Sequence, residues 1–352
     1  MEAQQIEKDR LQEGFSNFEK IKRLMLGFSA FQTLVAGCRL NLFEVLAQHP
    51  GSERNELAAH LGLSRHATRV LLLGCCTYEL VTTNDGCYYN TSMSEQFLTA
   101  KSIFPIVDFT EYCDVVQYKA FQHLTESLKA DTNLGLQTLP GEGDSLYKRL
   151  AQSPELEQIF QAGMAPKDRG SRELFFDAEE FRDVRHLLDI AGGPGLIASL
   201  LKQEYPHLAI TLFDLPSVCE RANATFGEHG FSDLGTHPGD CFTDPFPTGM
   251  DAVLFSHVLE VFSEEKIVFL LTKAFDALPV DGKVFIYGMA SDDVEGGADM
   301  AAWGSLYFLV LASGEGMMYP AHDYRRWLKA AGFSNITERS NDFENVILIA
   351  SK

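Results

Sequence analysis

The sequence is short of basic residues and contains no long apolar run. Its 352 residues include 29 Lys and Arg against 49 Asp and Glu, a formal net charge of −20. A surface with this charge repels phosphate backbones and anionic membranes, so we expect neither nucleic acid nor a membrane as a partner. No apolar run approaches the length of a membrane span, and the N-terminal segment MEAQQIEKDRLQEGF lacks the apolar core of a signal peptide. The sequence therefore predicts a cytoplasmic protein.

Regular cysteine spacing is also absent. The seven cysteines form no CxxC pair and no metal-ligand pattern, so we expect mostly buried thiols and no metal site. Apolar residues make up 45% of the chain and charged residues 22%, as in folded globular proteins, without repeats or low-complexity tracts. A chain of this length has room for two domains of ordinary size.

The first 100 residues carry the pattern of a winged helix. Apolar residues recur at helical spacing from Ile21 to Leu46, as one long amphipathic helix or two short ones. The segment ELAAHLGLSRHATRVLLLGCCTYELV then predicts two helices, with a turn at Gly62 and Ser64 as the second N-cap. The segment TTNDGCYYNT predicts a turn at Asp85–Gly86 between short strands.

Winged helices often bind DNA through the second helix of the motif. Here that helix begins with Arg65, His66 and Arg69 but continues as LLLGCC, which is typical of a packed face. The acidic balance of the chain also disfavours DNA. We therefore interpret this region as a dimerisation or substrate-lid module, and a ligand-sensing DNA-binding regulator stays a distant alternative.

The predicted secondary structure of the remaining chain changes at His186, from mostly helices to alternating strands and helices. Residues 101–175 are predicted to be mostly helical, with a break at LPGEGDS and a later helix capped by Ser153. From His186 onward strands alternate with helices, which predicts a parallel sheet covered on both faces, with a ligand beyond the carboxyl ends of the strands. We predict three segments: 1–100 helical and winged-helix, 101–175 a helical linker and substrate lid, and 176–352 the α/β domain.

Acidic and glycine residues follow the first three strands of the α/β domain. The first strand ends at Asp189 and leads into Gly192, Gly193 and Gly195, which let the backbone approach a ligand. The loop departs from the GxGxxG pattern of dinucleotide sites. Asp214 follows about 20 residues later, at the end of the second strand. A carboxylate at this place can accept hydrogen bonds from ribose hydroxyls. Asp240, after the third strand, is a candidate for reading an adenine amino group.

At this point the chain resembles the S-adenosylmethionine (SAM)-dependent small-molecule O-methyltransferases of the acetylserotonin and plant phenolic type. The resemblance rests on DIAGGPG, FDLPSV, GDCF and KAAGF and covers nearly the whole chain. It implies an α/β Rossmann-type class I methyltransferase domain, preceded by a mostly α-helical winged-helix domain that forms a homodimer and helps to close the substrate pocket. It also implies SAM as the cofactor and a small molecule as the substrate.

The resemblance assigns cofactor contacts to residues of these loops. They are Gly192, Asp214, Leu215, Asp240 and Cys241, with Ser256 near the methionine end of SAM; Asp189 and Gly193 belong to the same loop pattern. Other roles stay open for several of them. Asp189 and the glycines could serve only the tight turn, Asp214 could cap a helix, and Cys241 could simply pack.

The match breaks at the catalytic position. In the family a motif of the form Asn-x-Leu-His-Asp-Trp opens a helix, and its His is the general base. The corresponding segment here is HVLEVF, so Glu260 stands in place of the base and Val261 in place of the acid that orients it. A His with a pKa of about 6.5 suits a phenolic proton better than an exposed Glu at about 4.3, although burial can raise the latter.

His257 lies one helical turn before Glu260, so we expect the two side chains to share a face. His257 is an alternative base or a structural histidine. Glu260 is a base or a surface or capping carboxylate.

A downstream segment corresponds to the family's substrate-facing wall. Its apolar members include Trp303, Tyr307 and Met317, and its polar members are Glu315 and His322. Glu315 lies close to where relatives carry a second acid, or it is a solvated loop residue. Aromatic and sulfur side chains of the lid region, including Phe160 and Met164, are core residues or further pocket residues.

We therefore predict methyl transfer from SAM to a small secondary metabolite, by an in-line displacement that depends on positioning. Whether the nucleophile is oxygen, nitrogen or carbon stays open, but a carboxylate at position 260 suits an amine or an activated carbon better than a simple phenol. The altered catalytic residues leave a rival of the same fold. That rival uses SAM without methylation, in pericyclic or decarboxylation chemistry or by cyclising the aminobutyryl arm.

Overall fold

The computed structural model describes residues 2–102, 105–164, 178–228, 230–231, 233–291, 299–341 and 345–352. The chain divides into two compact units, Met1–Val116 with Glu155–Lys167 and Gln117–Pro154 with Asp168–Lys352. The segment that was expected to form a linker and lid thus contributes residues to both units.

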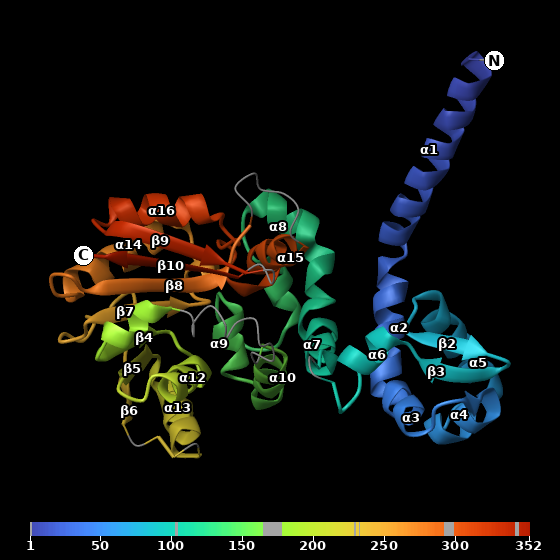
Figure 1. Ribbon diagram of the computed structural model, residues 1–352, viewed down its shortest axis with the longest axis horizontal. Coiled ribbons are helices and arrows are strands. Elements are labelled where there is room, and N and C mark those ends of the chain that lie inside the picture. Colours follow the sequence, from blue (N-terminus) through green and yellow to red (C-terminus); the bar gives the residue numbers. More distant parts are fainter. Residues whose placement is uncertain are drawn as a thin grey trace. The chain divides into compact units, whose positions relative to one another are not determined.

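The first unit is mostly helical and carries a small antiparallel sheet of order β1-β3-β2 (Figure 1). Its regular elements are α1 (Glu2–Met25), α2 (Gly27–Arg39), α3 (Leu42–Gln48), β1 (Ser52–Glu53), α4 (Arg54–Leu61), α5 (Arg65–Thr77), β2 (Val81–Asn84), β3 (Cys87–Asn90), α6 (Ser92–Phe97), α7 (Val107–Tyr112) and α10 (Pro154–Met164). The succession α4, α5, β2, β3 is the predicted helix, turn, helix and wing.

Local signals explain these boundaries. Gly62 ends α4 with a left-handed φ of 65°, and the Oγ of Ser64 accepts the backbone N–H of Ala67 at 3.1 Å to cap α5. Asp85–Gly86, with φ of 49° and 82°, reverses the chain between β2 and β3. The expectation of one or two helices between residues 21 and 46 is wrong. Three helices occur there because Asn41, at φ 58°, separates α2 from α3.

The second unit is built on a seven-stranded sheet of order β6-β5-β4-β7-β8-β10-β9. The strands are β4 (His186–Ile190), β5 (Ala209–Asp214), β6 (Leu234–Pro238), β7 (Ala252–Ser256), β8 (Lys283–Met289), β9 (Ser334–Ser340) and β10 (Asn345–Ser351). Strands β4, β5, β6, β7 and β8 pair in parallel with their neighbours in this set. Strand β10 is antiparallel to both of its neighbours, β8 and β9. The expectation of a wholly parallel sheet is therefore wrong at this edge, because β9 and β10 are too close in sequence for a crossover.

Alternating side chains of the strands point into two separate cores. On β4, Leu188 and Ile190 belong to one core and Leu187 to the other. Helices α14 (Glu264–Ala277) and α16 (Ala321–Ala330) pack into the first core, and α12 (Leu196–Glu204) and α13 (Pro216–Glu228) pack into the second (Figure 1). The strand order reverses at β4, which lies between β5 and β7, so a ligand site is expected beyond its carboxyl end.

Short helices complete the second unit. They are the 3₁₀ helices η2 (Ala120–His123), η3 (Leu134–Thr138), η4 (Glu179–Asp183) and η5 (Leu259–Val261), the α-helices α8 (Leu124–Ala130), α9 (Leu146–Leu150) and α15 (Asp299–Tyr307), and the π-helix η6 (Phe308–Ala312). A further π-helix, η1 (Cys113–Gln117), follows α7. Both π-helices directly continue an α-helix, a place where local widening is frequent at functional sites.

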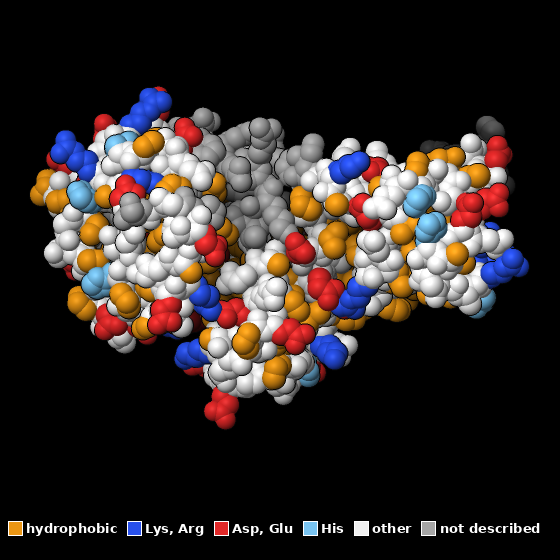
Figure 2. Space-filling model, turned by 90° about the horizontal axis from the view of Figure 1, so that it is seen from below, with side chains coloured by type: hydrophobic (Ala, Val, Ile, Leu, Met, Phe, Trp, Pro, Cys, Tyr) orange, Lys and Arg blue, Asp and Glu red, His pale blue; other side chains and the backbone are white. Residues whose placement is uncertain are grey.

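The surface charges, the helix hydropathy and the cysteines can be compared with what the composition predicted. On the face drawn in Figure 2, Lys and Arg side chains occur singly or in small groups among Asp and Glu. No helix in the described ranges is long and apolar enough to cross a membrane. The described cysteines are free; Cys75 and Cys219 are buried and the others are half-buried.

An apolar stripe lies exposed on the N-terminal helices. Leu24 is 77% exposed, Met25 67% and Phe28 62%, and Phe18 and Ile21 are also exposed. Phe18, Ile21, Met25 and Phe28 follow helical spacing along one face. An apolar stripe of this kind needs a partner surface, and the homodimer expected through this region would supply it.

We predict that Leu24→Glu combined with Phe28→Glu converts a dimer into single chains, because two carboxylates would have to be buried in the contact. Light scattering after size-exclusion chromatography should show the molar mass falling by half. The control is Val280→Glu, at an apolar residue of the second unit that is 80% exposed and should leave the mass unchanged. A dimer that persists in the double variant would exclude this stripe as the interface.

Candidate cofactor and catalytic site

The turn between β4 and α12 has a backbone that only small residues permit. Gly193 and Gly195 have φ of 60° and 80°, and a Cβ on Gly195 would lie 2.4 Å from the ring of Phe226. A Cβ on Gly192 would lie 2.3 Å from the Oδ2 of Asp189. A Cβ on Gly193 would meet nothing within 4 Å. Two of the glycines therefore serve tight packing, whereas Gly193 borders open space where a ligand can approach.

Asp189 is a buried acid at the end of β4. Its residue surface is 0% exposed, and neither carboxyl oxygen has a hydrogen-bond partner among the described residues. Burial, with a smaller contribution from the charge of Asp214, raises the pKa of Asp189 from 3.8 to about 7. Buried polar groups are normally hydrogen-bonded, so this carboxyl group points to a donor or cation that a ligand supplies.

Asp214 joins the end of β5 to the glycine turn. Its Oδ2 accepts the N–H of Gly193 at 3.0 Å, and its Oδ1 accepts the N–H of Leu215 at 2.7 Å. Burial raises the pKa of Asp214, and these two hydrogen bonds oppose the shift. Leu215 follows with 47% of its surface exposed, which leaves an apolar face next to the carboxylate.

The loop after β6 is held by its own carboxylates and by a lysine. The N–H of Phe242 donates to the Oδ1 of Asp240 at 2.8 Å. Lys273 of α14 donates to the carbonyl oxygen of Cys241 at 2.6 Å and to that of Asp244. The Lys273 ammonium also lies 4.3 Å from the ring centre of Phe246. Sequence reasoning missed Lys273 because its partners lie about 30 residues earlier, beyond any local pattern.

Two serines lie at the ends of the neighbouring strands. The buried hydroxyls of Ser256, the last residue of β7, and Ser291, just after β8, have no hydrogen-bond partner among the described residues. Together with Asp189 they place unpartnered polar atoms at the carboxyl ends of three adjacent strands. This is the edge at which doubly wound sheets bind ligands. Ser256 was expected at the site, and Ser291 was not.

The candidate base Glu260 lies in η5, directly beyond β7. It is 4% exposed, so the interpretation as a surface carboxylate is wrong. Its Oε1 lies 3.3 Å from the Nδ1 of His257, whose side chain is 43% exposed. A Cβ on Gly288 would lie only 3.1 Å from the same oxygen, so the backbone of β8 passes close to the carboxylate.

The pairing of His257 with Glu260 is confirmed, but the helix expected to begin at His257 is wrong. His257 has a left-handed φ of 54° and donates its N–H to the carbonyl oxygen of Tyr287 at 2.8 Å, and α14 begins only at Glu264. The strand-like hydrogen bond to β8 competes with helix formation. The His257 ring packs edge-on against Tyr287, with ring centres 5.0 Å apart.

The charge of Glu260 acts on two phenol groups. Burial raises the pKa of Tyr147 on α9, and the neighbouring Tyr307 and the charge of Glu260 raise it further. One flank of Tyr147 remains open, because 39% of its surface is exposed. Burial and the charge of Glu260 likewise raise the pKa of Tyr324 on α16. Tyr147 was not among the expected site residues.

An aromatic wall continues from Tyr307. The rings of Trp303 and Tyr307 are stacked, with centres 5.6 Å apart and planes 8° apart. The indole N–H of Trp303 donates to the Oε1 of Gln117 at 2.9 Å. Met318 packs against Gly304, the residue after Trp303, and Met317 is half-buried.

The remaining expected residues have other neighbours. Glu315 forms an ion pair with Lys266 of α14, although the backbone at the adjacent Gly316 packs against that of Glu260. His322 begins the first turn of α16, with its Nε2 3.6 Å from the Oδ1 of Asp323.

Phe160 and Met164 belong to the first unit. Phe160 packs edge-on against Tyr112 with ring centres 5.6 Å apart, and Met164 ends α10 and is 43% exposed.

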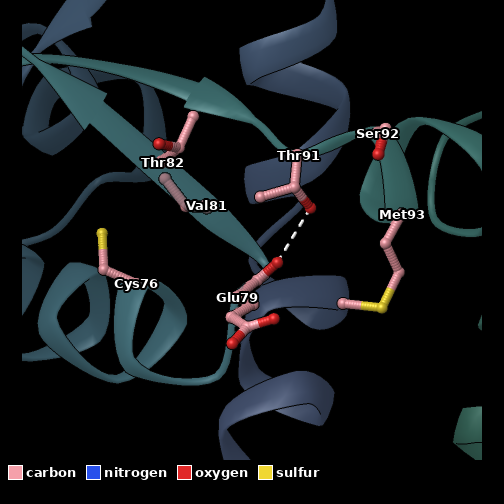
Figure 3. A pocket seen from close by; sticks show the side chains of 7 residues that line it. All are labelled: Cys76, Glu79, Val81, Thr82, Thr91, Ser92 and Met93. Atoms are coloured by element: carbon pink, nitrogen blue, oxygen red, sulfur yellow. Dashed lines mark hydrogen bonds between the residues drawn. The ribbon is translucent and has the colours of Figure 1, made fainter.

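The first unit contains a pocket of about 360 Å³ (Figure 3). The residues that line it are Cys76, Glu79, Val81, Thr82, Thr91, Ser92 and Met93. Thr91 donates its hydroxyl to the carbonyl oxygen of Glu79 at 2.8 Å, and burial raises the pKa of the Cys76 thiol. This lining pairs no base with a nucleophile. Across the described ranges, no group of His, Cys, Asp or Glu could hold a metal ion.

The strand order, the glycine turn and the acids at three strand ends define the second unit as a Rossmann-type methyltransferase domain. Comparison with known families extends this: an O-methyltransferase domain matches residues 121–334 and an O-methyltransferase dimerisation domain matches residues 22–100. The chain belongs to the SAM-dependent O-methyltransferase family.

Individual relatives agree with this assignment. The chain is 33% identical over 341 residues to the L-tyrosine C(3)-methyltransferase of Streptomyces lavendulae, covering 96% of this chain and 93% of that protein. It is 29% identical to the acetylserotonin O-methyltransferase of Homo sapiens, covering 87% and 90% of the two chains. The solved SAM-dependent methyltransferase SibL superposes with a TM-score of 0.80 at 32% identity, covering 95% and 98%.

The protein is thus a SAM-dependent methyltransferase, and the predicted family, fold class and cofactor are confirmed. The human acetylserotonin enzyme in complex with SAM has a TM-score of 0.81 at 25% identity, covering 96% of this chain and 97% of that chain. The relatives lend no support to the non-methylating alternative.

Asp189 predicts how the stability of the ligand-free protein depends on pH. Its folded pKa of about 7 lies above the ordinary 3.8, so between these values the folded state holds a proton that the unfolded chain has released. Stability should therefore fall as the pH rises through this window, by at most about 4 kcal/mol. Asp189→Asn should flatten this dependence in chemical denaturation between about pH 5 and pH 8. Asp276→Asn, at an exposed aspartate of α14, should keep the wild-type slope; an unchanged slope in Asp189→Asn would contradict the assignment.

Lys273 predicts a change in cofactor affinity. Lys273→Met keeps the apolar stem but removes the donors to the carbonyl oxygens of Cys241 and Asp244, so the loop that carries Asp240 should loosen. We expect the dissociation constant for SAM to rise roughly tenfold in isothermal titration calorimetry. Lys329→Met, at an exposed lysine of α16, should leave it within about twofold of wild type. Equal effects of both variants would refute a specific role for Lys273.

Proposed function

We propose that the enzyme methylates a ring carbon next to the hydroxyl of a tyrosine-like phenol. The observation that carries this proposal is the buried carboxylate of Glu260, 3.3 Å from the Nδ1 of His257. The family resemblance places a histidine at the position of Glu260. The relative with 33% identity is named for methylation at C3 of L-tyrosine, which supports a carbon nucleophile.

The residues present fit a SAM molecule at the carboxyl edge of the sheet. The unpartnered carboxyl of Asp189 and hydroxyl of Ser256 suit its polar methionine end, Asp214 suits the ribose, and exposed Leu215 suits the adenine face. The loop of Asp240 and Cys241, beside Gly192 and Gly193, would close the adenine end. When bound, SAM supplies a methyl group activated by its sulfonium.

Ring methylation makes different demands on a base than oxygen methylation does. The phenol would first lose its proton through His257 to water; its ortho carbon would then take the methyl group that bound SAM supplies, and S-adenosylhomocysteine would leave. The ring carbon then carries both a hydrogen and the new methyl group, and a base must take that hydrogen as a proton to restore aromaticity. A carboxylate held by burial beside the ring can do this, because the proton is acidic in the dearomatised ring.

The Glu260–His257 pair offers a route for that proton. Glu260 is buried, whereas the His257 side chain is 43% exposed and lies within 3.3 Å of it. A proton taken by Glu260 can pass to His257 and from there to water, since neutral imidazole accepts protons near neutral pH. Glu315, bound to Lys266, would then shape the loop rather than the base.

The cellular setting belongs to the same proposal. The dimerisation-domain match at residues 22–100 supports a homodimer, and it supports a domain division near residue 100, with the second division at 175. The charge of −20 disfavours a nucleic-acid partner, and a cytoplasmic location and a small-molecule substrate belong to the same proposal. Within the second unit, Trp303, Tyr307, Met317 and His322 remain proposed substrate-pocket residues, and Phe160 and Met164 remain separate candidates in the first unit.

The test uses L-tyrosine carrying deuterium at both ring positions next to the hydroxyl, incubated with SAM and analysed by mass spectrometry. Ring methylation should add one methyl group and lose one deuterium. Methylation of oxygen or nitrogen should add the methyl group and keep both. Retention of both deuterium atoms would overturn the carbon assignment and favour the oxygen chemistry of the acetylserotonin relatives.

Glu260→Gln should lower kcat about 100- to 1,000-fold, because the amide cannot accept the ring proton. Its dissociation constant for SAM should stay unchanged. The matched control is Glu265→Gln, at an exposed glutamate in the first turn of α14, which should keep wild-type turnover. Near-normal turnover of Glu260→Gln would remove Glu260 from the base role.

A further inference from the structure

Gln117 holds a buried hydrogen-bond donor that none of the described residues uses. The side chain is 3% exposed, and its Nε2 has no partner among the described residues. Its Oε1 accepts the indole N–H of Trp303 at 2.9 Å. Because an indole nitrogen is only a donor, this bond requires the amide oxygen to face Trp303 and leaves the NH₂ group facing another way.

The place of Gln117 in the fold connects it to the catalytic pair. Trp303 stacks on Tyr307 with ring centres 5.6 Å apart, and Tyr307 and Glu260 both act on the pKa of Tyr147. Direct contacts therefore run from the amide through Trp303 to Tyr307, and Tyr147 feels both Tyr307 and the charge of the buried carboxylate. Tyr307 is buried, but Trp303 is half-buried and can offer an aromatic face to a substrate.

Both ends of this wall lie next to π-helices. Gln117 is the last residue of η1, and Tyr307 directly precedes η6. Such helices displace one residue out of the regular pattern and often occur where a side chain must be aimed at a ligand. The two helical distortions thus support a role for this contact beyond packing.

We propose that Gln117 selects the substrate by donating a hydrogen bond to an oxygen acceptor on its tail, at the end remote from the reacting ring. The inference rests on the ring-methylation function proposed above and adds the substrate class: a phenol whose side chain carries a carboxylate or a carbonyl group. A neutral amide donor can serve either group. Glu260 serves the ring in the function proposed above, so the amide and the carboxylate would bind different parts of one molecule.

The test compares three phenols with the full-length enzyme: L-tyrosine with a carboxylate, L-tyrosine methyl ester with a carbonyl, and tyramine with neither. Gln117→Leu should raise KM for the acid, the ester or both by about 10- to 30-fold, leave kcat within about twofold, and leave tyramine unaffected. A higher KM for the acid alone would assign the acceptor as a carboxylate, and a higher KM for the ester as a carbonyl. An equal rise for tyramine, or no rise for any substrate, would overturn the proposal.

Two variants separate the donor from its support. Gln117→Glu can still accept the Trp303 indole N–H but has no NH₂ group, so it should lose the same discrimination as the leucine variant. Trp303→Phe removes the bond that orients the amide and should raise KM for the same substrates by a smaller factor. Wild-type discrimination in Gln117→Glu would refute the donor role.

Binding without turnover distinguishes this inference from the function on which it rests. The chain has two tryptophans, and Trp303 touches Gln117. Ligand binding at the amide should therefore change tryptophan fluorescence, and the change should be lost in Trp303→Phe. Suppose that Gln117→Leu weakens binding of the acid or the ester, while the product keeps both deuterium atoms. This result would refute ring methylation but support the donor role of Gln117. Ring methylation with an unchanged KM in Gln117→Leu would support the proposed function but refute the donor role of Gln117.

Discussion

The site depends on the parallel register that β4 shares with its two neighbours. Asp189 lies opposite Leu212 of β5 and Leu254 of β7, so the carboxyl ends of these strands end at one common edge. The polar groups brought there do not satisfy one another, because the carboxyl of Asp189 and the hydroxyl of Ser256 have no hydrogen-bond partner in the part of the chain that the structure describes. The packed sheet offsets the free energy lost by burying them. That edge can therefore accept a ligand without first breaking internal hydrogen bonds.

Helix α14 connects the two halves of the site. Its N-terminus follows the turn that holds Glu260, and one face packs in the core through Ile267, Leu270 and Leu271. Further along, Lys273 holds the loop after β6. The loop assigned to the adenine end and the turn assigned to the base are thus mounted on one rigid helix. Rigid mounting of this kind keeps reacting groups within the small tolerance that in-line transfer needs.

The substituted catalytic motif keeps an acid and an imidazole but exchanges their positions. The family resemblance places an imidazole at the buried position and a carboxylate beside it. Here the carboxylate is buried at 260, and the imidazole lies three residues earlier with 43% of its side chain exposed. In the proposed function the buried group would contact the reacting molecule and the exposed group would exchange protons with water. The change redistributes the acid–base chemistry without removing it.

The sequence by itself determined the elements that depend on local chemistry. Glycine spacing, strand periodicity and capping residues predicted the turn at residues 191–195, the strands of the second unit that form its core, and the winged helix. The sequence did not predict strand β9, because its segment SNITERS lies mostly exposed at the sheet edge and has few apolar residues. It also failed at the helix expected from His257, where a hydrogen bond to β8 prevailed.

Only the tertiary structure decided which distant side chains share a site. Gln117 meets Trp303 across 186 positions of the chain, and Lys273 meets Cys241 across 32. The burial of Glu260 against Gly288 likewise depends on the pairing of β7 with β8. Such contacts leave no periodic trace in a single sequence, because periodicity reports only which face of an element is buried and not what lies opposite it.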